Sequence, residues 1–210
     1  MKIIAHRGMW QSPQEQNTHA AFKRALEHGF GIETDFRDCD GRLVISHDLP
    51  DARSLDAEIF FDLCNRHPNT DPHAINIKSD GLQALLEIHL KQWSTDRYFI
   101  FDMSIPDTLG YLRHQLNTFS RISEYENYQN FDGKTSGIWV DGFAGEWYTA
   151  ELLQTYLREG KSLAIVSPEL HGRNYQSLWA MIKAIDAPKA NLMLCTDLPL
   201  EARGYFNESD

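Results

Sequence analysis

Residues 31–48 read GIETDFRDCDGRLVISHD: a short apolar run that ends in acidic residues, a turn signal, and a second apolar run. The first run alternates as a β-strand does, because side chains at every second position share one face of the pleated chain. A short apolar run that ends in a polar residue recurs at seven other places: residues 2–6, 74–78, 98–102, 119–124, 137–141, 162–167 and 192–197. The sequence therefore predicts eight strands.

Helical periodicity with recognisable ends separates most of these runs. The expected helices cover residues 18–28, 54–65, 80–89, 107–116, 149–159 and 175–186, whereas residues 125–136 are too polar and aperiodic for a helix. Alternating strands and helices imply parallel strands with crossover helices. We expect a small (β/α)8 TIM barrel with a short β-hairpin extension after the second strand and reduced helices. The competing doubly wound sheet normally has a glycine-rich first turn, which HRGMWQSPQ is not.

Composition restricts the class of protein. The 210 residues suit one domain over residues 1–210, and a net charge of -10 without a basic cluster argues against a nucleic-acid surface. Three widely spaced cysteines favour reduced thiols in the cytoplasm over disulfides or a zinc site. We expect a soluble cytoplasmic protein without a signal peptide, because no apolar run approaches the ~18 residues of a membrane span. The oligomeric state stays open.

In a barrel, the carboxyl ends of the strands meet at one mouth, where active sites form. The polar residues at the predicted strand ends are His6, Arg7, Glu33, Asp35, Lys78, Asp102, Glu124, Asp141, Ser167 and Asp197. Glu33 and Asp35 are two residues apart, so both carboxylates lie on one side of their strand. A hard divalent cation, Mg²⁺ or Ca²⁺, would relieve their repulsion. The DCDG segment is not a calcium loop, because no glutamate follows at the required distance.

Asp40-Gly41 is a turn signal, and the length of the turn sets the register of the hairpin. A two-residue turn would place Thr34 opposite His47, whereas a three-residue loop would place Glu33 there. We predict the three-residue loop, because it puts the acidic pair and the imidazole on one face.

Two of the nine histidines follow strand-like runs and precede a charged residue. His6 and His47 supply a general base and a general acid if they lie on opposite sides of a substrate. Arg7 and Lys78 add positive charge for an anion, the first as a planar fork and the second as a point charge. A metal, two histidines and two cations around one mouth indicate phosphodiester chemistry.

The segments IAHRG, NTHAAFKRAL, GIETDFRDCDGRLVISHD, INIK and TDLP resemble, in order and spacing, the glycerophosphodiester phosphodiesterase family. These enzymes are barrels of the same superfamily as the bacterial phosphatidylinositol-specific phospholipases C. The resemblance implies a metal-dependent phosphoric diester hydrolase, in which His6 and His47 are the acid/base pair and Arg7 holds the phosphate. It also implies that Glu33 and Asp35 bind the metal, and that a neighbouring substrate hydroxyl attacks phosphorus and expels the alcohol through a cyclic phosphate.

The chain departs from this pattern on the third strand. The family has an acidic metal ligand two residues before the lysine, where this sequence has Asn76 before Lys78. An amide oxygen binds Mg²⁺ or Ca²⁺ without contributing charge, so we expect Asn76 to be the third metal ligand, with Asp102 or Glu124 as alternatives.

Two further differences leave the released alcohol open. Residues 49–73 are fewer than in the usual insertion, and SPELHGR at residues 167–173 is unlike the usual motif. Glu169, His171 and Arg173 there form either a pocket for another phosphorylated group or a surface loop. The leading hypothesis is hydrolysis of a small or polymer-linked glycerophosphodiester. The alternatives are a sugar-linked phosphodiester and a non-catalytic barrel that binds a phosphorylated ligand.

Overall fold

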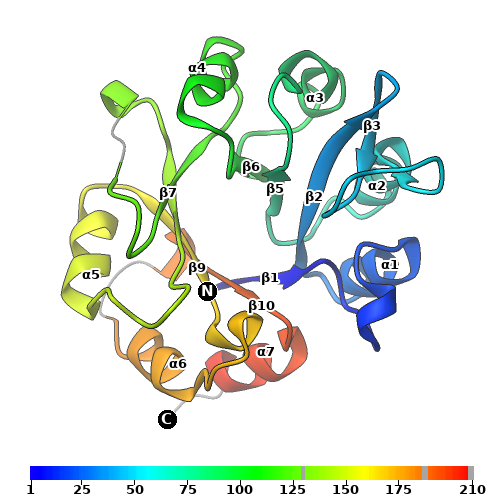
Figure 1. Ribbon diagram of the computed structural model, residues 1–210. Coiled ribbons are helices and arrows are strands. Elements are labelled where there is room, and N and C mark those ends of the chain that lie inside the picture. The colour runs from blue at the N-terminus through cyan, green and yellow to red at the C-terminus, as the bar shows by residue number, and fades with distance from the viewer. Residues whose placement is uncertain (129–130, 186–188, 208–210) are drawn as a thin grey trace.

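The computed structural model describes residues 1–128, 131–185 and 189–207. Eight parallel strands curl around a common centre, and helices cover their outer side (Figure 1). The strands are β1 (Lys2–His6), β2 (Gly31–Cys39), β5 (His73–Ile77), β6 (Tyr98–Phe101), β7 (Phe119–Ile122), β8 (Gly137–Val140), β9 (Ser162–Val166) and β10 (Leu192–Thr196). Parallel ladders join them in the order β6-β5-β2-β1-β10-β9-β8-β7. All eight predicted strands are present, in a TIM-barrel-like α/β fold.

The seam between β6 and β7 differs from the other strand contacts. Among the described residues, one isolated bridge between Ile100 and Thr118 joins the two strands, with a 2.8 Å hydrogen bond from the Ile100 amide to the Asn117 carbonyl. The strand β6 ends after four residues because Asp102 adopts a left-handed backbone conformation, with φ of 74°. The expected (β/α)8 barrel is therefore present as a curled sheet that stays open along this seam, and a full ring of ladders is not formed.

Six helices lie close to the predicted positions, and a seventh follows the last strand. They are α1 (His19–Glu27), α2 (Ala57–Arg66), α3 (Gln83–Leu90), α4 (Ile105–Arg113), α5 (Ala150–Arg158), α6 (Gln176–Lys183) and α7 (Pro199–Asn207). Hydroxyl groups of Thr18, Ser104 and Thr149 cap the starts of α1, α4 and α5. Between β7 and β8, the described residues form an isolated bridge between Ser123 and Glu126 and the 3₁₀ turn η2 (Phe131–Gly133) but no α-helix, in agreement with the sequence. In the part of the chain that the structure describes, no helix has the length and apolar character of a membrane span.

Alternation along the strands separates an inner from an outer core. The inner cluster fills the centre of the curled sheet with Ile4, Ala74, Phe99, Phe101, Phe119, Trp139, Ala164, Val166, Met193 and Cys195. The rings of Phe101 and Trp139 stack 3.9 Å apart. A residue two positions beyond an inner residue points to the same side. His6, Asn76 and Asp141 each stand in this relation to an inner residue, so they point into the mouth.

The hairpin extension after β2 is present. It consists of the end of β2, β3 (Arg42–Ile45) and the short β4 (Leu55–Asp56). Cys39 pairs with Arg42, which leaves Asp40 and Gly41 as a two-residue turn. Their φ angles are 50° and 76°, as a type I′ turn requires.

The predicted three-residue loop is therefore wrong. The observed register brings Thr34, not Glu33, into line with His47, although the ladder ends before them. The type I′ turn is favoured because its twist matches that of the two strands it joins. Placing an imidazole near the acids does not need the predicted register, since His47 lies beyond the end of β3.

The buried imidazole of His73 makes the stability of the fold sensitive to acid. His73 is fully buried, and its Nδ1 accepts a hydrogen bond of 3.2 Å from the Ile32 amide. Burial, with a smaller effect of Arg97, lowers the pKa of His73 to about 3. The unfolded chain takes up this proton near pH 6.5, whereas the folded chain takes it up only near pH 3. Between these values the unfolded state binds more protons, so stability falls as the pH is lowered.

We expect the free energy of unfolding of the wild type to fall more steeply than that of His73→Gln below pH 6.5. The difference in slope is about 1.4 kcal/mol per pH unit, the value for one proton. Urea denaturation at several pH values between 4 and 8 measures both slopes. Equal pH dependence of the free energy of unfolding in the two proteins would contradict a neutral buried His73.

Candidate active site

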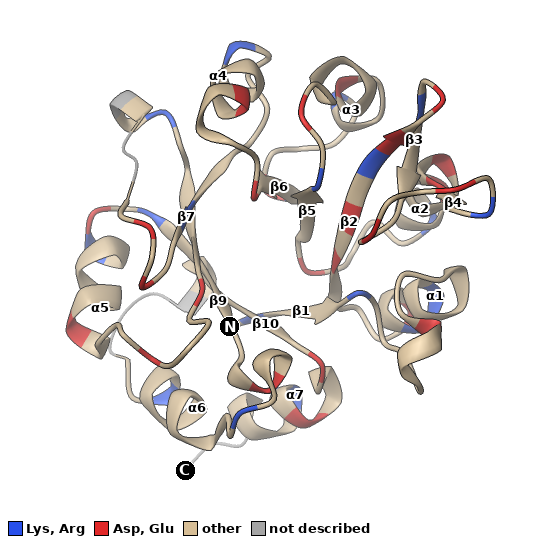
Figure 2. Cartoon of the chain, in the orientation of Figure 1, with Lys and Arg blue, Asp and Glu red and all other residues tan. Residues whose placement is uncertain are grey.

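A cavity of about 280 Å³ opens at the carboxyl ends of the strands. All seven residues predicted for the site line it: His6, Arg7, Glu33, Asp35, His47, Asn76 and Lys78. The other polar lining residues are Asp102, Asp141 and His171, and the apolar ones are Phe101, Trp139, Phe143, Val166 and Leu170. Figure 2 shows acidic and basic stretches of the chain around the centre of the ring. Of the remaining predicted strand-end residues, Glu124, Ser167 and Asp197 are not among the lining residues.

The acidic pair on β2 is almost completely buried. Glu33 is 2% exposed and Asp35 is 1% exposed. Oε1 of Glu33 accepts a 2.9 Å hydrogen bond from the Asn76 amide, whereas its buried Oε2 has no hydrogen-bond partner in the described chain. Burial, followed by the charge of Asp35, raises the pKa of Glu33. Glu33 is therefore a carboxylate whose charge this site leaves incompletely compensated.

Asp35 lies between two cations. Its Oδ2 is 3.4 Å from Nε of Arg7, and its Oδ1 is 3.7 Å from Nζ of Lys78. Asn17, which the sequence pattern did not single out, donates a 2.8 Å hydrogen bond to Oδ2 of Asp35 and accepts one of 2.7 Å from the Thr34 hydroxyl. Asn17 opens the quoted segment NTHAAFKRAL, and this position was the only available signal of its role.

His6 is held by a carboxylate from the last strand end. Nδ1 of His6 donates to Oδ1 of Asp197 over 2.7 Å, which directs Nε2 toward Glu33, at 3.9 Å from its Oε2. Burial lowers the pKa of His6, but the hydrogen bond to Asp197 and the charge of Glu33 outweigh this effect and raise it. Glu169 accepts a 3.1 Å hydrogen bond from the Asp197 amide, so it positions Asp197 and is not a lining residue of the cavity.

His47 reaches the cavity from the end of the hairpin and is more exposed than His6. Its side chain is 48% exposed, and its Nδ1 is 2.9 Å from Oδ1 of Asp48. The Arg37 guanidinium donates a 3.1 Å hydrogen bond to the His47 carbonyl and so ties this end of the hairpin to β2. Asp48 is therefore within hydrogen-bond distance of the imidazole of His47.

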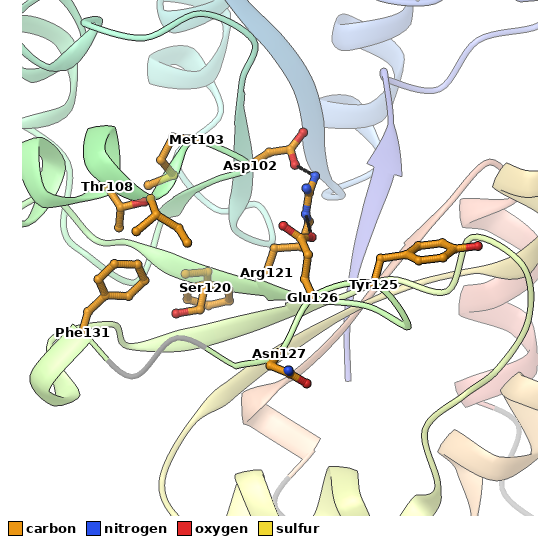
Figure 3. A pocket seen from close by; sticks show the side chains of 11 residues that line it. Asp102, Met103, Thr108, Ser120, Arg121, Tyr125, Glu126, Asn127 and Phe131 are labelled. Carbon is orange, nitrogen blue, oxygen red and sulfur yellow. Dashed lines mark hydrogen bonds and ion pairs between the residues drawn. The ribbon is translucent and has the colours of Figure 1, made fainter.

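A chain of ion pairs runs from Lys78 to the open seam. Lys78 contacts Asp102 over 2.9 Å, Asp102 contacts Arg121, and Arg121 contacts Glu126. A second cavity of about 250 Å³ lies at the seam, and Figure 3 shows Asp102 and Arg121 pointing toward each other in it. Arg121 was missed because the strand was expected to end at Glu124.

Neither alternative for the third metal ligand is favoured. Glu124 accepts hydrogen bonds from the amides of Phe143 and Ala144, and Asp102 is occupied by Lys78 and Arg121.

The donor atoms around Glu33 fit a hard divalent cation. Oε2 of Glu33 and Oδ1 of Asn76 are buried oxygens without hydrogen-bond partners among the described residues, and Asp35 pairs with Asn76 across the β2–β5 ladder. Mg²⁺ and Ca²⁺ bind carboxylate and amide oxygens. The described residues contain no cluster of three or more His, Cys, Asp or Glu that could hold a metal.

No family model matches the sequence, and the search of curated proteins finds no match. Solved structures do match over almost the whole chain. Glycerophosphodiester phosphodiesterase from Agrobacterium tumefaciens has 16% identity and a TM-score of 0.70, covering 97% of this chain and 99% of the other. An Oleispira antarctica phosphodiesterase in complex with the product sn-glycerol-3-phosphate has 15% identity and a TM-score of 0.73, covering 99% and 97%.

A Ca²⁺-dependent phosphatidylinositol-specific phospholipase C from Streptomyces antibioticus is more distant. It has 12% identity and a TM-score of 0.52, covering 96% of this chain and 95% of the other. The chain therefore has the fold of the glycerophosphodiester phosphodiesterases, as the sequence motifs predicted.

The contacts of Asn17 lead to a prediction about stability. Its φ is 57°, in the left-handed region where glycine is tolerated and alanine is strained. Asn17→Gly removes only the side-chain hydrogen bonds to Asp35 and Thr34, so we expect a loss of about 1–3 kcal/mol. Asn17→Ala adds backbone strain and is expected to lose about 1 kcal/mol more. Urea denaturation measures both, and equal stability of Asn17→Gly and wild type would contradict a structural role for these bonds.

Proposed function

We propose that the protein is a metal-dependent phosphodiesterase that hydrolyses a glycerophosphodiester or a related diester by His/His general acid–base catalysis. One observation carries this proposal: His6, His47, Arg7 and Lys78 line the same cavity as a buried acidic pair. The cavity opens at the carboxyl ends of parallel strands, where barrel enzymes have their active sites. The fold is shared with glycerophosphodiester phosphodiesterases, and fold alone does not determine function.

His6 is suited to accept a proton. Because its Nδ1–H is directed to Asp197, its Nε2 is the free base. In the proposed reaction, Nε2 of His6 removes the proton of a substrate hydroxyl next to the phosphate. The hydroxyl oxygen bonds to phosphorus, and the bond from phosphorus to the alcohol oxygen breaks. His47 protonates that oxygen, and water then opens the cyclic phosphate with the two imidazoles in reversed roles.

Arg7 and Lys78 are the proposed phosphate-binding residues. Nε of Arg7 is 3.4 Å from Oδ2 of Asp35, and Nζ of Lys78 is 3.7 Å from Oδ1. The two cations therefore lie close to the acidic pair. Guanidinium and ammonium groups near developing negative charge on phosphorus stabilise the transition state. Asp102 competes with the phosphate for Lys78, since it lies only 2.9 Å from Nζ.

Glu33, Asp35 and Asn76 are the proposed ligands of Mg²⁺ or Ca²⁺. When bound, the cation supplies Lewis acidity toward the phosphoryl oxygens. The Asn76 side chain would turn its unpartnered Oδ1 to the metal while its amide nitrogen continues to hold Oε1 of Glu33.

Two further features belong to the same proposal. We place residues 1–210 in one domain, since the outer hydrophobic cluster spans residues from Ile3 to Ala202. The free cysteines, two of them buried, support the cytoplasm as the compartment.

Catalysis by the two histidines leads to a direct test. We expect wild type to release glycerol-3-phosphate from a glycerophosphodiester, and His6→Ala and His47→Ala to lower kcat by about 10²- to 10⁴-fold. His114→Ala is the matched control, because this exposed histidine at the end of α4 pairs with Glu87 and is not among the lining residues of the cavity. Steady-state kinetics on glycerol-linked and sugar-linked diesters give these values. Binding of a phosphorylated ligand without turnover of any diester would favour the non-catalytic barrel.

The amide ligand leads to a test of the metal site. Asn76→Asp replaces the donor to Glu33 with a third carboxylate, so without metal we expect it to lose about 1–3 kcal/mol of stability. Excess Mg²⁺ or Ca²⁺ is expected to raise its Tm more than that of wild type, because a third charge strengthens binding. Asn76→Ala lacks both the donor and the oxygen and serves as the control. Thermal unfolding with added metal or chelator measures these shifts, and metal-independent turnover and Tm would contradict the site.

A further inference from the structure

One wall of the active-site cavity has no role in the proposed reaction. It consists of lining residues from β8, β9 and the loops that follow them: Trp139, Asp141, Phe143, Val166, Leu170 and His171. In the strand order, β8 and β9 lie across the mouth from β2 and β5, which carry the acidic pair and Lys78. A diester whose phosphate lies near Lys78 therefore directs one of its alcohol groups toward this wall.

Asp141 and His171 are the only polar side chains among the lining residues of this wall. Nε2 of His171 donates to Oδ1 of Asp141 over 2.8 Å, and the Gly142 amide donates to the same oxygen over 2.8 Å. The two side chains are 11% and 25% exposed, so they are screened from bulk water but open to the cavity. The Phe143 ring packs 5.4 Å from the imidazole.

Rigid elements hold this pair in position. His171 ends the 3₁₀ turn η3 (Pro168–His171), and Gly172 follows it with φ of 70°. Glu169 ties this turn to the end of β10 by accepting hydrogen bonds from Thr196 and from the Asp197 amide. Asp141 is held from the other side, where the Trp147 indole donates a 2.7 Å hydrogen bond to its carbonyl.

Three histidines that line the cavity each pair with a carboxylate, and only two of these pairs are used in the proposed reaction. His6 with Asp197 and His47 with Asp48 supply the base and the acid. The third pair lies beside the Phe143 ring, on the wall of the cavity opposite the acidic pair. We propose that Asp141 and His171 determine specificity by binding hydroxyl groups of an uncharged, hydroxyl-rich alcohol such as a polyol or a sugar. This inference rests on the proposed phosphodiesterase function and names the substrate class for that site.

The chemistry of the pair favours hydroxyl groups over other alcohol substituents. A carboxylate oxygen accepts hydrogen bonds and an imidazole both donates and accepts, which matches a hydroxyl group that does both. The Phe143 ring, whose centre lies 5.4 Å from that of the imidazole, suits the C–H bonds of a carbon chain or sugar ring. A second phosphate is disfavoured, because Asp141 compensates His171, and the nearby Arg173 already contacts Glu146 over 3.2 Å and the Gly142 carbonyl.

The inference is tested with two diesters that differ only in two hydroxyl groups, glycerophosphoglycerol and glycerophosphopropanol. We expect wild type to prefer the first by about 10²-fold in kcat/KM, because a site that binds hydroxyl groups is left unpaired by the propyl group. Asp141→Asn and His171→Phe are expected to reduce this preference at least tenfold through a higher KM for the glycerol diester. Turnover of the propyl diester should fall much less, because the propyl group makes no hydrogen bond with the pair.

The controls separate this inference from the proposed function. Leu170→Met changes an apolar lining residue of the same turn and should leave the preference intact. Equal losses on both diesters in Asp141→Asn would overturn the inference in favour of a structural pair. A preference for glycerophosphocholine that depends on Asp141 would overturn it in favour of a cation site.

If wild type hydrolyses no diester, the proposed function fails, and an NMR titration still tests the pair. In that case, the hydroxyl site is supported if the protein binds myo-inositol but neither cyclohexanol nor propanol, and if Asp141→Asn abolishes the binding of myo-inositol. Equal binding of all alcohols would overturn it.

Discussion

Two like charges buried side by side on one strand are the constraint on which the rest of this structure depends. Glu33 and Asp35 point to the same side of β2 and are almost without contact with solvent. Burying an ionised carboxylate is unfavourable unless it is paired and hydrogen-bonded, and burying two together adds their repulsion. Every strand end near β2 contributes a group that reduces this cost.

The negative charges of Asp35 and Glu33 are compensated to different extents by neighbouring groups. Asp35 has Arg7 and Lys78 nearby and a hydrogen bond from Asn17. Glu33 has one amide hydrogen bond and an orphaned oxygen, and its pKa is raised. A fold selected only for stability would not retain an unpartnered buried carboxylate oxygen, since an apolar residue there is often less costly. The unfavourable energy of this site is understandable if a cation completes it.

The alternation of the strands connects this site to the core. The side chains that fill the centre of the curled sheet and those that line the mouth belong to the same inner series, two residues apart. Packing of Phe101 against Trp139 therefore forms part of the cavity wall, and the aromatic core continues directly into the site. The wall across the mouth from the acids carries the pair of Asp141 and His171 on this aromatic surface.

The local sequence was sufficient to predict the strands, most helices and the main site residues. It was not sufficient to predict contacts between segments that are distant in the chain. Strand ends followed from apolar runs with polar termini, and these runs gave six of the seven predicted lining residues. Asn76 was identified only through the family resemblance, as the residue in place of the usual acidic ligand. The helix α7 was missed, because TDLP was considered as a motif and the residues after it were not. Arg121 was missed because the end of β7 was placed two residues too late. Asn17 was missed because its hydrogen-bond partners, Asp35 and Thr34, lie on β2 and are distant from it in the sequence.

By itself, the sequence determined the number and order of the strands and the polar residues at their ends. It also determined that Glu33 and Asp35 lie on one face of their strand. These features depend on the local periodicities of two residues in strands and 3.6 residues in helices. Only the tertiary structure decided the two-residue turn at Asp40, the open seam beside β6 and the partner of each charged group. Both turn lengths are compatible with the local residues, and ion pairs join segments far apart in the chain. Such choices depend on the twist and curvature of the whole sheet, which no local pattern specifies.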